Sequence, residues 1–247
     1  MKGWKIILAA LAIGVLWQLL AWIVNLPILP PPLNVLETFA REMFGELGWH
    51  FLASFWRVTA SMLLSITLAA PAGLLLGQSR RIDQFLSPVI YLLYPVPKVV
   101  LVPLVLLFLG INDISKIMII FLILFFQILV LVRDQAASIT PELLYSVRSL
   151  GAGRRALFRF VYLPASIPAI LTALRQSIGT AVAVLYIVEL IATRRGLGYY
   201  IYFQGSTLFN YNKMYAGVIA MSLLGLGMYF VVDVLQRKAA PWQSSSQ

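Results

Sequence analysis

Residues 114–132 read ISKIMIIFLILFFQILVLV, and only Ser115, Lys116 and Gln127 in this stretch are polar. A helix that crosses a lipid bilayer needs about 20 mainly apolar residues. The stretch therefore predicts a transmembrane helix. The same criterion predicts six spans in all, at about residues 6–24, 51–77, 85–109, 114–132, 165–191 and 214–235.

The composition supports this class over the whole chain. The 247 residues are 61% hydrophobic and 11% charged, whereas roughly a quarter of the residues in soluble domains are charged. We predict an all-α integral membrane protein with a single transmembrane domain over residues 1–240 and a disordered tail over residues 241–247. The apolar run after Lys5 is longer than that of a signal peptide, so we interpret it as an uncleaved first span.

Several other classes of protein do not fit the composition. The net charge is +10, but the basic residues are scattered over short loops and form no patch typical of nucleic-acid binding. The chain has no cysteine, which excludes disulfides and thiolate ligands. The single histidine, His50, has no second ligand at metal spacing, so we predict no metal site.

The loop charges predict that both termini are cytoplasmic, because cytoplasmic loops carry the excess of lysine and arginine. With the N-terminus inside, the larger basic set is cytoplasmic: Lys2, Lys5, Arg80, Arg81, Arg133, Arg148, Arg154, Arg155, Arg159, Arg237 and Lys238. The smaller set is external: Arg41, Lys116, Arg194, Arg195 and Lys213. The adjacent arginines 194 and 195 are the feature that fits this orientation least.

The third predicted span contains Pro95, Pro97 and Pro103. Proline lacks an amide donor and clashes with the preceding turn, so a straight helix is not expected there. A broken helix at membrane depth is tolerated beside other protein or a water-filled cavity. Residues 94–103 are thus a candidate lining of a pathway, and an ordinary proline kink is the alternative.

The segment from residue 140 to residue 164 reads TPELLYSVRSLGAGRRALFRFVYLP, and it is too charged to span a membrane. We predict two short helices in it. Thr140 is a candidate N-cap of the first, Pro141 suits its first position, and Gly151 ends it. The second is predicted from about Arg154 to Val161.

Apolar residues on these two helices are expected to form a docking face. Leu143, Val147 and Leu150, with Leu144 beside them, form a stripe on the first helix, and Leu157, Phe160 and Val161 come together on the second. The face suits docking into a groove of another protein. An interfacial helix on anionic lipid, or a mere positive-inside signal, are the alternatives.

The same segment resembles the signature of the permeases of ATP-binding-cassette importers. That signature runs Glu-Ala-Ala, three residues, Gly, nine residues, Ile-x-Leu-Pro. Here Tyr145-Ser146-Val147 precedes Gly151 by the same spacing, and Val161-Tyr162-Leu163-Pro164 follows it by the same spacing. Tyr145 stands in place of the acidic residue. This departure puts in doubt a salt bridge that the acidic residue would make with the ATPase, and it leaves the prediction of a helix-turn-helix unchanged.

The resemblance covers nearly the whole chain and is closest to the nitrate, sulfonate, taurine and bicarbonate branch. Supporting segments include PVPKVVLVPLVLLFLGINDISKI and VELIATRRGLGYYI. It implies the type I importer permease fold, with a cytoplasmic coupling loop at residues 133–164. The implied contacts with the ATPase are Tyr145, Ser146, Val147, Arg148, Ser149, Leu150, Gly151, Ala152, Leu163 and Pro164.

The resemblance implies a multi-pass permease of the bacterial cytoplasmic membrane. Its implied partners are a second permease copy, two ATPase subunits that bind ATP and magnesium, and an extracytoplasmic binding protein that delivers a small anion. A P-loop needs Gly-x-x-x-x-Gly-Lys-Ser/Thr, and no Gly-Lys pair occurs in the chain. The permease is therefore expected to hold no cofactor and to perform no ATP hydrolysis.

Charges within the predicted spans are functional candidates because each is costly in a bilayer. Lys98 is expected either to attract an anion in transit or to pair with Glu189 or snorkel. The candidate pathway residues are Tyr94, Pro97, Lys98, Gln127 and Glu189. Arg57 and Arg175 are expected to stabilise the fold or lie at an interface, and Asp233 to meet water or Arg237.

The external loop from Arg194 to Tyr215 is rich in aromatic residues, including Tyr199, Tyr200 and Tyr202. An aromatic belt at the membrane surface is one interpretation, and a docking surface for the binding protein is the other. Three alternatives to an anion permease stay open: a permease for a vitamin precursor, a self-sufficient channel or secondary carrier, and a membrane-embedded enzyme. Transport without ATP or partners would indicate the channel or carrier.

Overall fold

The computed structural model describes residues 3–191 and 193–239, and every regular element in that part of the chain is helical. The predicted tail lies outside the described residues. The elements are α1 (Gly3–Val24), α2 (Pro32–Met43), α3 (Glu46–Gln78), α4 (Arg80–Leu93), the 3-10 turn η1 (Lys98–Leu101), α5 (Val102–Leu109), α6 (Asp113–Ala137), α7 (Pro141–Ser149), α8 (Arg154–Leu157), the π turn η2 (Phe158–Tyr162), α9 (Leu163–Leu190), α10 (Leu197–Tyr202), the π turn η3 (Phe203–Thr207) and α11 (Tyr211–Ala239).

Five of the six predicted spans are present as single helical stretches, in the predicted order. Five helical stretches are long and apolar enough to cross a bilayer, at Ile7–Val24, Glu46–Gln78, Asp113–Ala137, Arg155–Leu190 and Tyr211–Ala239. The sixth is a bent pair, Arg80–Leu93 with Lys98–Leu109, whose halves meet at 77°. The bend falls at the predicted proline-rich break.

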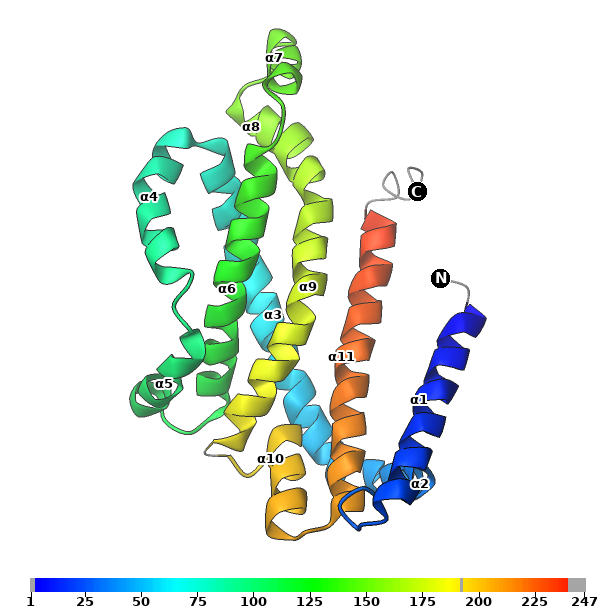
Figure 1. The fold of residues 1–247 in the computed structure, drawn as a ribbon. Helices are drawn as coiled ribbons and strands as arrows, with labels where there is room; N and C mark the ends of the chain where they lie inside the picture. Colours follow the sequence, from blue (N-terminus) through cyan, green and yellow to red (C-terminus); the bar gives the residue numbers. More distant parts are fainter. Residues whose placement is uncertain (1–2, 192, 240–247) are drawn as a thin grey trace. The chain divides into compact units, whose positions relative to one another are not determined.

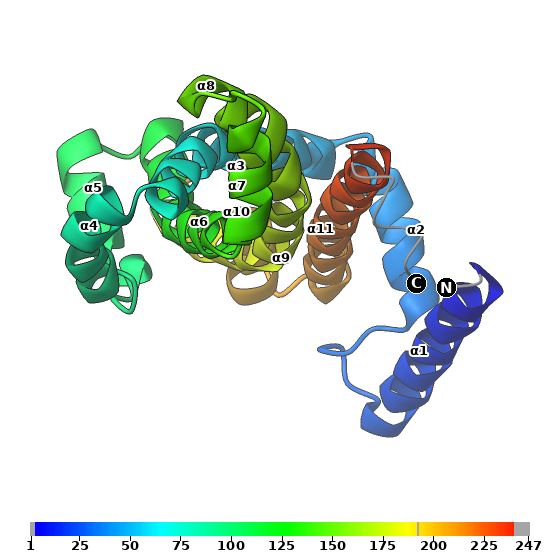
Figure 2. The ribbon, with the colours of Figure 1, turned by 90° about the horizontal axis from the view of Figure 1, so that it is seen from above.

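The contacts divide the chain into two compact units, which are described separately. The first consists of Met1–Phe55 and Glu189–Leu224, and the second of Trp56–Val188 and Gly225–Gln247. In the second unit, α4 and α5 flank α6 on the side away from α9 (Figures 1 and 2). A single domain over residues 1–240 stays a prediction.

Within the second unit, α3 and α6 are parallel neighbours with a constant offset of 56 residues. Ser61 Oγ donates to the carbonyl of Ile117 at 3.2 Å, and Ser65 Oγ approaches that of Phe121 at 3.4 Å. Further along, Gly73 and Gly77 face the α6 backbone so closely that a Cβ on Gly77 would lie 2.6 Å from the carbonyl oxygen of Arg133. Small residues at four-residue spacing allow helices to pack this closely in membranes.

The start of α6 is fixed by a side-chain cap. The Asn112 side-chain oxygen accepts a hydrogen bond from the amide of Ser115 at 3.0 Å, as expected for an N-cap residue. Behind this cap, Ile119, Ile120, Leu124 and Ile128 are almost completely buried. This face of α6 forms much of the core of the second unit.

Two elements differ from the expectation. The second short helix of the 140–164 segment is not separate, because α8, η2 and α9 run on as one helical stretch to Leu190. The π turn, in which Leu163 donates to the carbonyl of Phe158, widens the helix just before Pro164, whose ring would clash in a regular turn. The short helix α2 was missed because a search for 20-residue apolar runs cannot find a 12-residue amphipathic helix.

Candidate functional site

The first predicted helix of the 140–164 segment is present as α7. It begins with Pro141 at its first position and carries Glu142 in its first turn. The chain leaves it through Gly151, whose φ of +83° is the left-handed conformation that glycine adopts without penalty. Thr140 occupies the N-cap position as predicted, but its side chain forms no capping hydrogen bond within the described residues. Pro141, with its φ already helical, prepares the first turn instead.

One side of α7 packs on the rest of the second unit and the other side is exposed. Leu144 and Val147 contact a buried cluster of Leu157, Val161 and Tyr162. Leu143 and Leu150, by contrast, are 46% and 86% exposed. The predicted stripe of Leu143, Val147 and Leu150 is therefore split between the two sides.

Two aromatic side chains of the 140–164 segment are exposed as well. Tyr145 is 66% exposed and Phe160 is 70% exposed. The predicted grouping of Phe160 with Leu157 and Val161 is wrong, because only the latter two are buried in the cluster. Figure 1 shows α7 beyond the ends of α6 and α9.

A pocket of about 350 Å³ lies in the second unit beside the bend between α4 and α5. Its lining includes four of the five predicted pathway residues, Tyr94, Pro97, Lys98 and Gln127. Thr180 and Val184 of α9 also line it and were missed by the sequence analysis. Their four-residue spacing on one helix face was the available signal, but a threonine and a valine in a span do not stand out.

The Lys98 ammonium has specific backbone partners in this pocket. Its Nζ donates to the carbonyl oxygens of Leu93 at 2.8 Å and Tyr94 at 2.6 Å. It also lies 4.7 Å from the centre of the Phe126 ring. A cation is stabilised by the free carbonyls at a helix C-terminus. Lys98 thus caps α4 where the prolines interrupt the helix.

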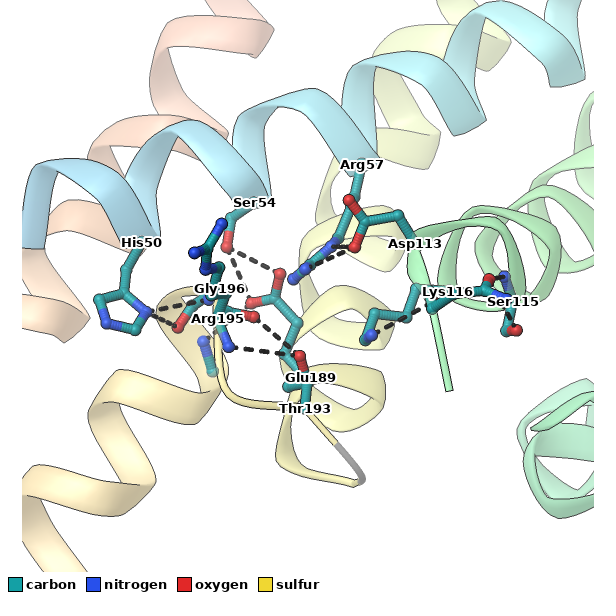
Figure 3. A network of polar contacts seen from close by, with 12 residues as sticks. His50, Ser54, Arg57, Asp113, Ser115, Lys116, Glu189, Thr193, Arg195 and Gly196 are labelled. Carbon is teal, nitrogen blue, oxygen red and sulfur yellow. Dashed lines mark hydrogen bonds and ion pairs between the residues drawn. The ribbon is translucent and has the colours of Figure 1, made fainter. Parts of the chain in front are cut away.

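Glu189, the remaining predicted pathway residue, is fully buried in the first unit. Ser54 Oγ lies 2.8 Å from each of its carboxylate oxygens, and the amide of Gly198 donates to Oε2 at 2.9 Å (Figure 3). Ser54 Oγ accepts in turn from the amide of Leu197 at 2.7 Å. The carboxylate therefore joins α3 to the start of α10. Its pairing with Lys98 stays a prediction.

Gly196 is the tightest position of this network. Its φ is +123°, and a Cβ there would overlap the Glu189 carboxylate. The amide of Gly196 also donates to Nδ1 of His50 at 3.0 Å (Figure 3). His50 is thus held by the backbone of the loop before α10. Within residues 3–191 and 193–239, no three histidine or acidic side chains gather as a metal site.

Tyr200 of α10 belongs to the core of the first unit. It is 1% exposed, and its ring centre lies 5.2 Å from that of His50. The interpretation of Tyr200 as part of an aromatic belt is therefore wrong. Burial, with a smaller contribution from Glu42 and Glu46, raises the pKa of its phenol. Tyr202, in contrast, is 49% exposed.

The comparisons with known proteins cover most of the chain. Residues 65–242 match the family model described as the binding-protein-dependent transport system inner membrane component. The chain belongs to this family. The permease is 32% identical to the taurine transport system permease protein TauC of Escherichia coli K12, over 89% of this chain and 82% of the relative. It is 31% identical to the putative aliphatic sulfonates transport permease protein SsuC of Bacillus subtilis 168, over 98% and 89%.

A solved structure shares the fold of the permease. A chain of the MetNI methionine ABC transporter in an inward-facing conformation superposes with a TM-score of 0.70, over 80% of this permease and 97% of that chain. The sequence identity is 19%, so the likeness concerns the fold. The permease is accordingly a multi-pass, all-α transport subunit of an ABC importer.

The charged residues of the permease form ion pairs that stabilise the second unit. Arg57 is 3% exposed and donates to Oδ1 of Asp113 at 2.9 Å and 2.7 Å, so its expected structural role is confirmed (Figure 3). Arg175 and Arg237 both contact Asp233, at 3.2 Å and 2.8 Å. The pairing of Asp233 with Arg237 was expected. The pairing with Arg175, 58 residues away, was not.

Proposed function

We propose that this permease carries a small sulfonate-type anion across a bacterial inner membrane, as a homodimer with two ATPase subunits and an external binding protein. The ATPase subunits would bind ATP and magnesium, and the permease itself would hold no cofactor. Taurine and aliphatic sulfonates in the names of its relatives support the substrate class. The family description supports the membrane and the binding protein.

The observation that carries the proposal is the exposed side of α7. Leu143, Tyr145 and Leu150 are large apolar or aromatic side chains that remain exposed outside any membrane-spanning stretch. Leu143 and Leu150, seven residues apart on one flank of the helix, and Tyr145 on another flank present exposed apolar surface, which favours interaction with another protein. We assign this surface, with residues 145–152 and the Leu163–Pro164 step behind it, to contact with the ATPase.

The pathway is proposed to pass the pocket lined by Tyr94, Pro97, Lys98 and Gln127. Glu189, which belongs to the other unit, is proposed separately as a pathway residue. A bent, interrupted helix lines this pocket, and such irregular backbone is tolerated at membrane depth where it borders a cavity. The hydroxyl of Thr180 and the amide of Gln127 offer hydrogen bonds to a passing solute.

Reconstitution into liposomes tests the proposal. The permease, its ATPase subunit and a binding protein are expected to import taurine or an alkylsulfonate only when ATP is supplied on the side of α7. Liposomes without the ATPase subunit serve as the control. Uptake of the same rate without ATP or without partners would contradict the proposal and favour the channel or secondary carrier.

Two substrates of different net charge can distinguish attraction of an anion by Lys98 from the structural contacts that Lys98 makes. If the ammonium attracts the anion, Lys98→Met is expected to reduce uptake of an alkylsulfonate about fivefold, as for the loss of about 1 kcal/mol. Uptake of taurine, which carries its own ammonium, is expected to fall less. Lys98→Arg keeps the charge and is the matched control. An equal loss for both substrates would show that Lys98 only caps α4.

A further inference from the structure

A second pocket, of about 650 Å³, lies in the first unit beside the first turns of α3. Glu46, His50, Arg194 and Arg195 line its polar end. Trp49 and Leu52 line its other side, and these two side chains are 75% and 56% exposed. Its volume is in the range of small-molecule sites, about 300–1,000 Å³. The pocket thus combines a charged end with an open apolar wall.

The polar end carries a net positive charge. Among the residues that line the pocket, Arg194 and Arg195 carry two positive charges and Glu46 carries one negative charge, while His50 is neutral. Arg195 also has an interaction within the protein. The Glu46 carboxylate lies 3.7 Å from Nε2 of His50, one turn along α3. Guanidinium groups match the planar spacing of phosphate and sulfonate oxygens better than ammonium groups do. A single monoanion therefore complements this end.

The arginine pair stands on a segment that hydrogen bonds hold in place. Thr193 Oγ1 donates to the carbonyl of Arg195 at 3.0 Å and accepts from its amide at 3.4 Å. The next residue, Gly196, is bonded to Nδ1 of His50 at 3.0 Å. The backbone at Arg195 and Gly196 is thereby held, with Gly196 bonded to α3, which lowers the entropy lost when a ligand binds.

The pocket lies at the end of membrane-spanning helices. Glu46 begins the span Glu46–Gln78, and the arginines follow the end of the span Arg155–Leu190. Span ends lie at the level of the lipid headgroups, where tryptophan is enriched. Leu52, nearly one further turn along α3 from Trp49, extends the apolar wall towards the hydrocarbon region.

We propose that this pocket binds an anionic phospholipid, with the phosphodiester at Arg194 and Arg195 and the first part of an acyl chain along Trp49 and Leu52. The exposed apolar wall favours a lipid over a soluble anion, because such a wall needs an apolar partner. The proposal also explains why two adjacent arginines occur in a loop predicted to be external. An alkylsulfonate shares the chemistry of an oxyanion with an apolar tail, and the experiment separates these two sources.

The experiment measures lipid binding to the purified permease in detergent, without the ATPase. Phosphatidylglycerol with brominated acyl chains is titrated, and quenching of Trp49 is obtained as the difference from the Trp49→Phe variant. Arg194→Gln with Arg195→Gln is expected to weaken binding about thirtyfold, because each basic side chain contributes about fivefold at an anionic lipid surface. Glu46→Gln removes the opposing charge and is expected to strengthen binding.

The matched control is another adjacent arginine pair, Arg80 and Arg81, which is also exposed. Arg80→Gln with Arg81→Gln is expected to leave quenching of Trp49 unchanged. Equal weakening by both double variants, or equal quenching by brominated phosphatidylcholine, would overturn recognition of an anionic headgroup. Tighter binding of octanesulfonate than of phosphatidylglycerol would assign the pocket to a soluble anion and overturn the lipid proposal. None of these measurements depends on transport.

Discussion

Replacing Gly151 by valine is expected to lower ATP-driven uptake about tenfold while the transmembrane helices remain folded. Gly151 has a φ of +83°, and no described heavy atom lies within 4 Å of the position that a Cβ would take. The cost is therefore conformational and not steric, about 1–2 kcal/mol for an L-residue in the left-handed region. Because this turn sets the direction in which the chain continues from α7 to α8, relief of the strain would reorient the exposed side of α7.

Two control variants isolate the effect of the turn. Gly153 lies two residues further on, also has open space among the described residues, and has no positive φ, so Gly153→Val is expected to retain uptake. Gly151→Asn is expected to retain most uptake, because asparagine tolerates the left-handed region. Uptake and co-purification of the ATPase subunit are measured together. Equal losses for Gly151→Val and Gly153→Val would contradict a specific role of the left-handed turn.

Replacing Gly77 by alanine is expected to destabilise the permease by about 1–3 kcal/mol, the usual range for overpacking. The added Cβ would lie 2.5 Å from Cβ of Ala136 and 2.6 Å from the carbonyl oxygen of Arg133. Neither neighbour is the end of a flexible side chain, so α3 and α6 would have to separate. The melting temperature in detergent is expected to fall by about 3–10 °C.

Gly227→Ala is the matched control, since Gly227 also lies within a helix of the second unit. No atom of the described residues lies within 4 Å of its added Cβ. Alanine favours a helix over glycine by about 1 kcal/mol, so this variant is expected to melt at the same temperature or higher. A melting temperature for Gly77→Ala that matches the wild type would show that α3 and α6 do not pack through this glycine.

The sequence-based predictions were correct where a residue acts on its own stretch of backbone, and they failed where the outcome depends on residues distant in the sequence. The break near Pro95 and Pro97 and the turn at Gly151 were predicted because proline and glycine act on their own backbone. The predicted apolar stripe of Leu143, Val147 and Leu150 is divided in the structure, because Val147 packs against the buried cluster of the unit whereas Leu150 stays exposed. The roles of the coupling and pathway residues stay predictions.

The candidate pathway likewise combines residues that are close in the sequence with residues that are distant in it. Tyr94, Pro97 and Lys98 are close together in the sequence, so the sequence could predict that they lie near one another. Thr180 joins the same pocket from α9, more than 80 residues away along the chain, and its four-residue spacing from Val184 was too weak a signal to place it there. The ammonium of Lys98 donates to carbonyl oxygens of its own interrupted helix. Searching the spans for charged residues alone does not predict such backbone partners.

The sequence by itself determined that residues such as 114–132 cross a membrane, because a bilayer rejects polar groups whatever the partners are. It also determined the class of transporter, through the spacing from Tyr145 to Pro164. Only the tertiary structure decided which charges pair. Arg57 meets Asp113 because α3 and α6 pack in a register of 56 residues, and Glu189 meets Ser54 because the loop before α10 folds back on α3. Those choices depend on close packing between distant segments, which no local pattern encodes.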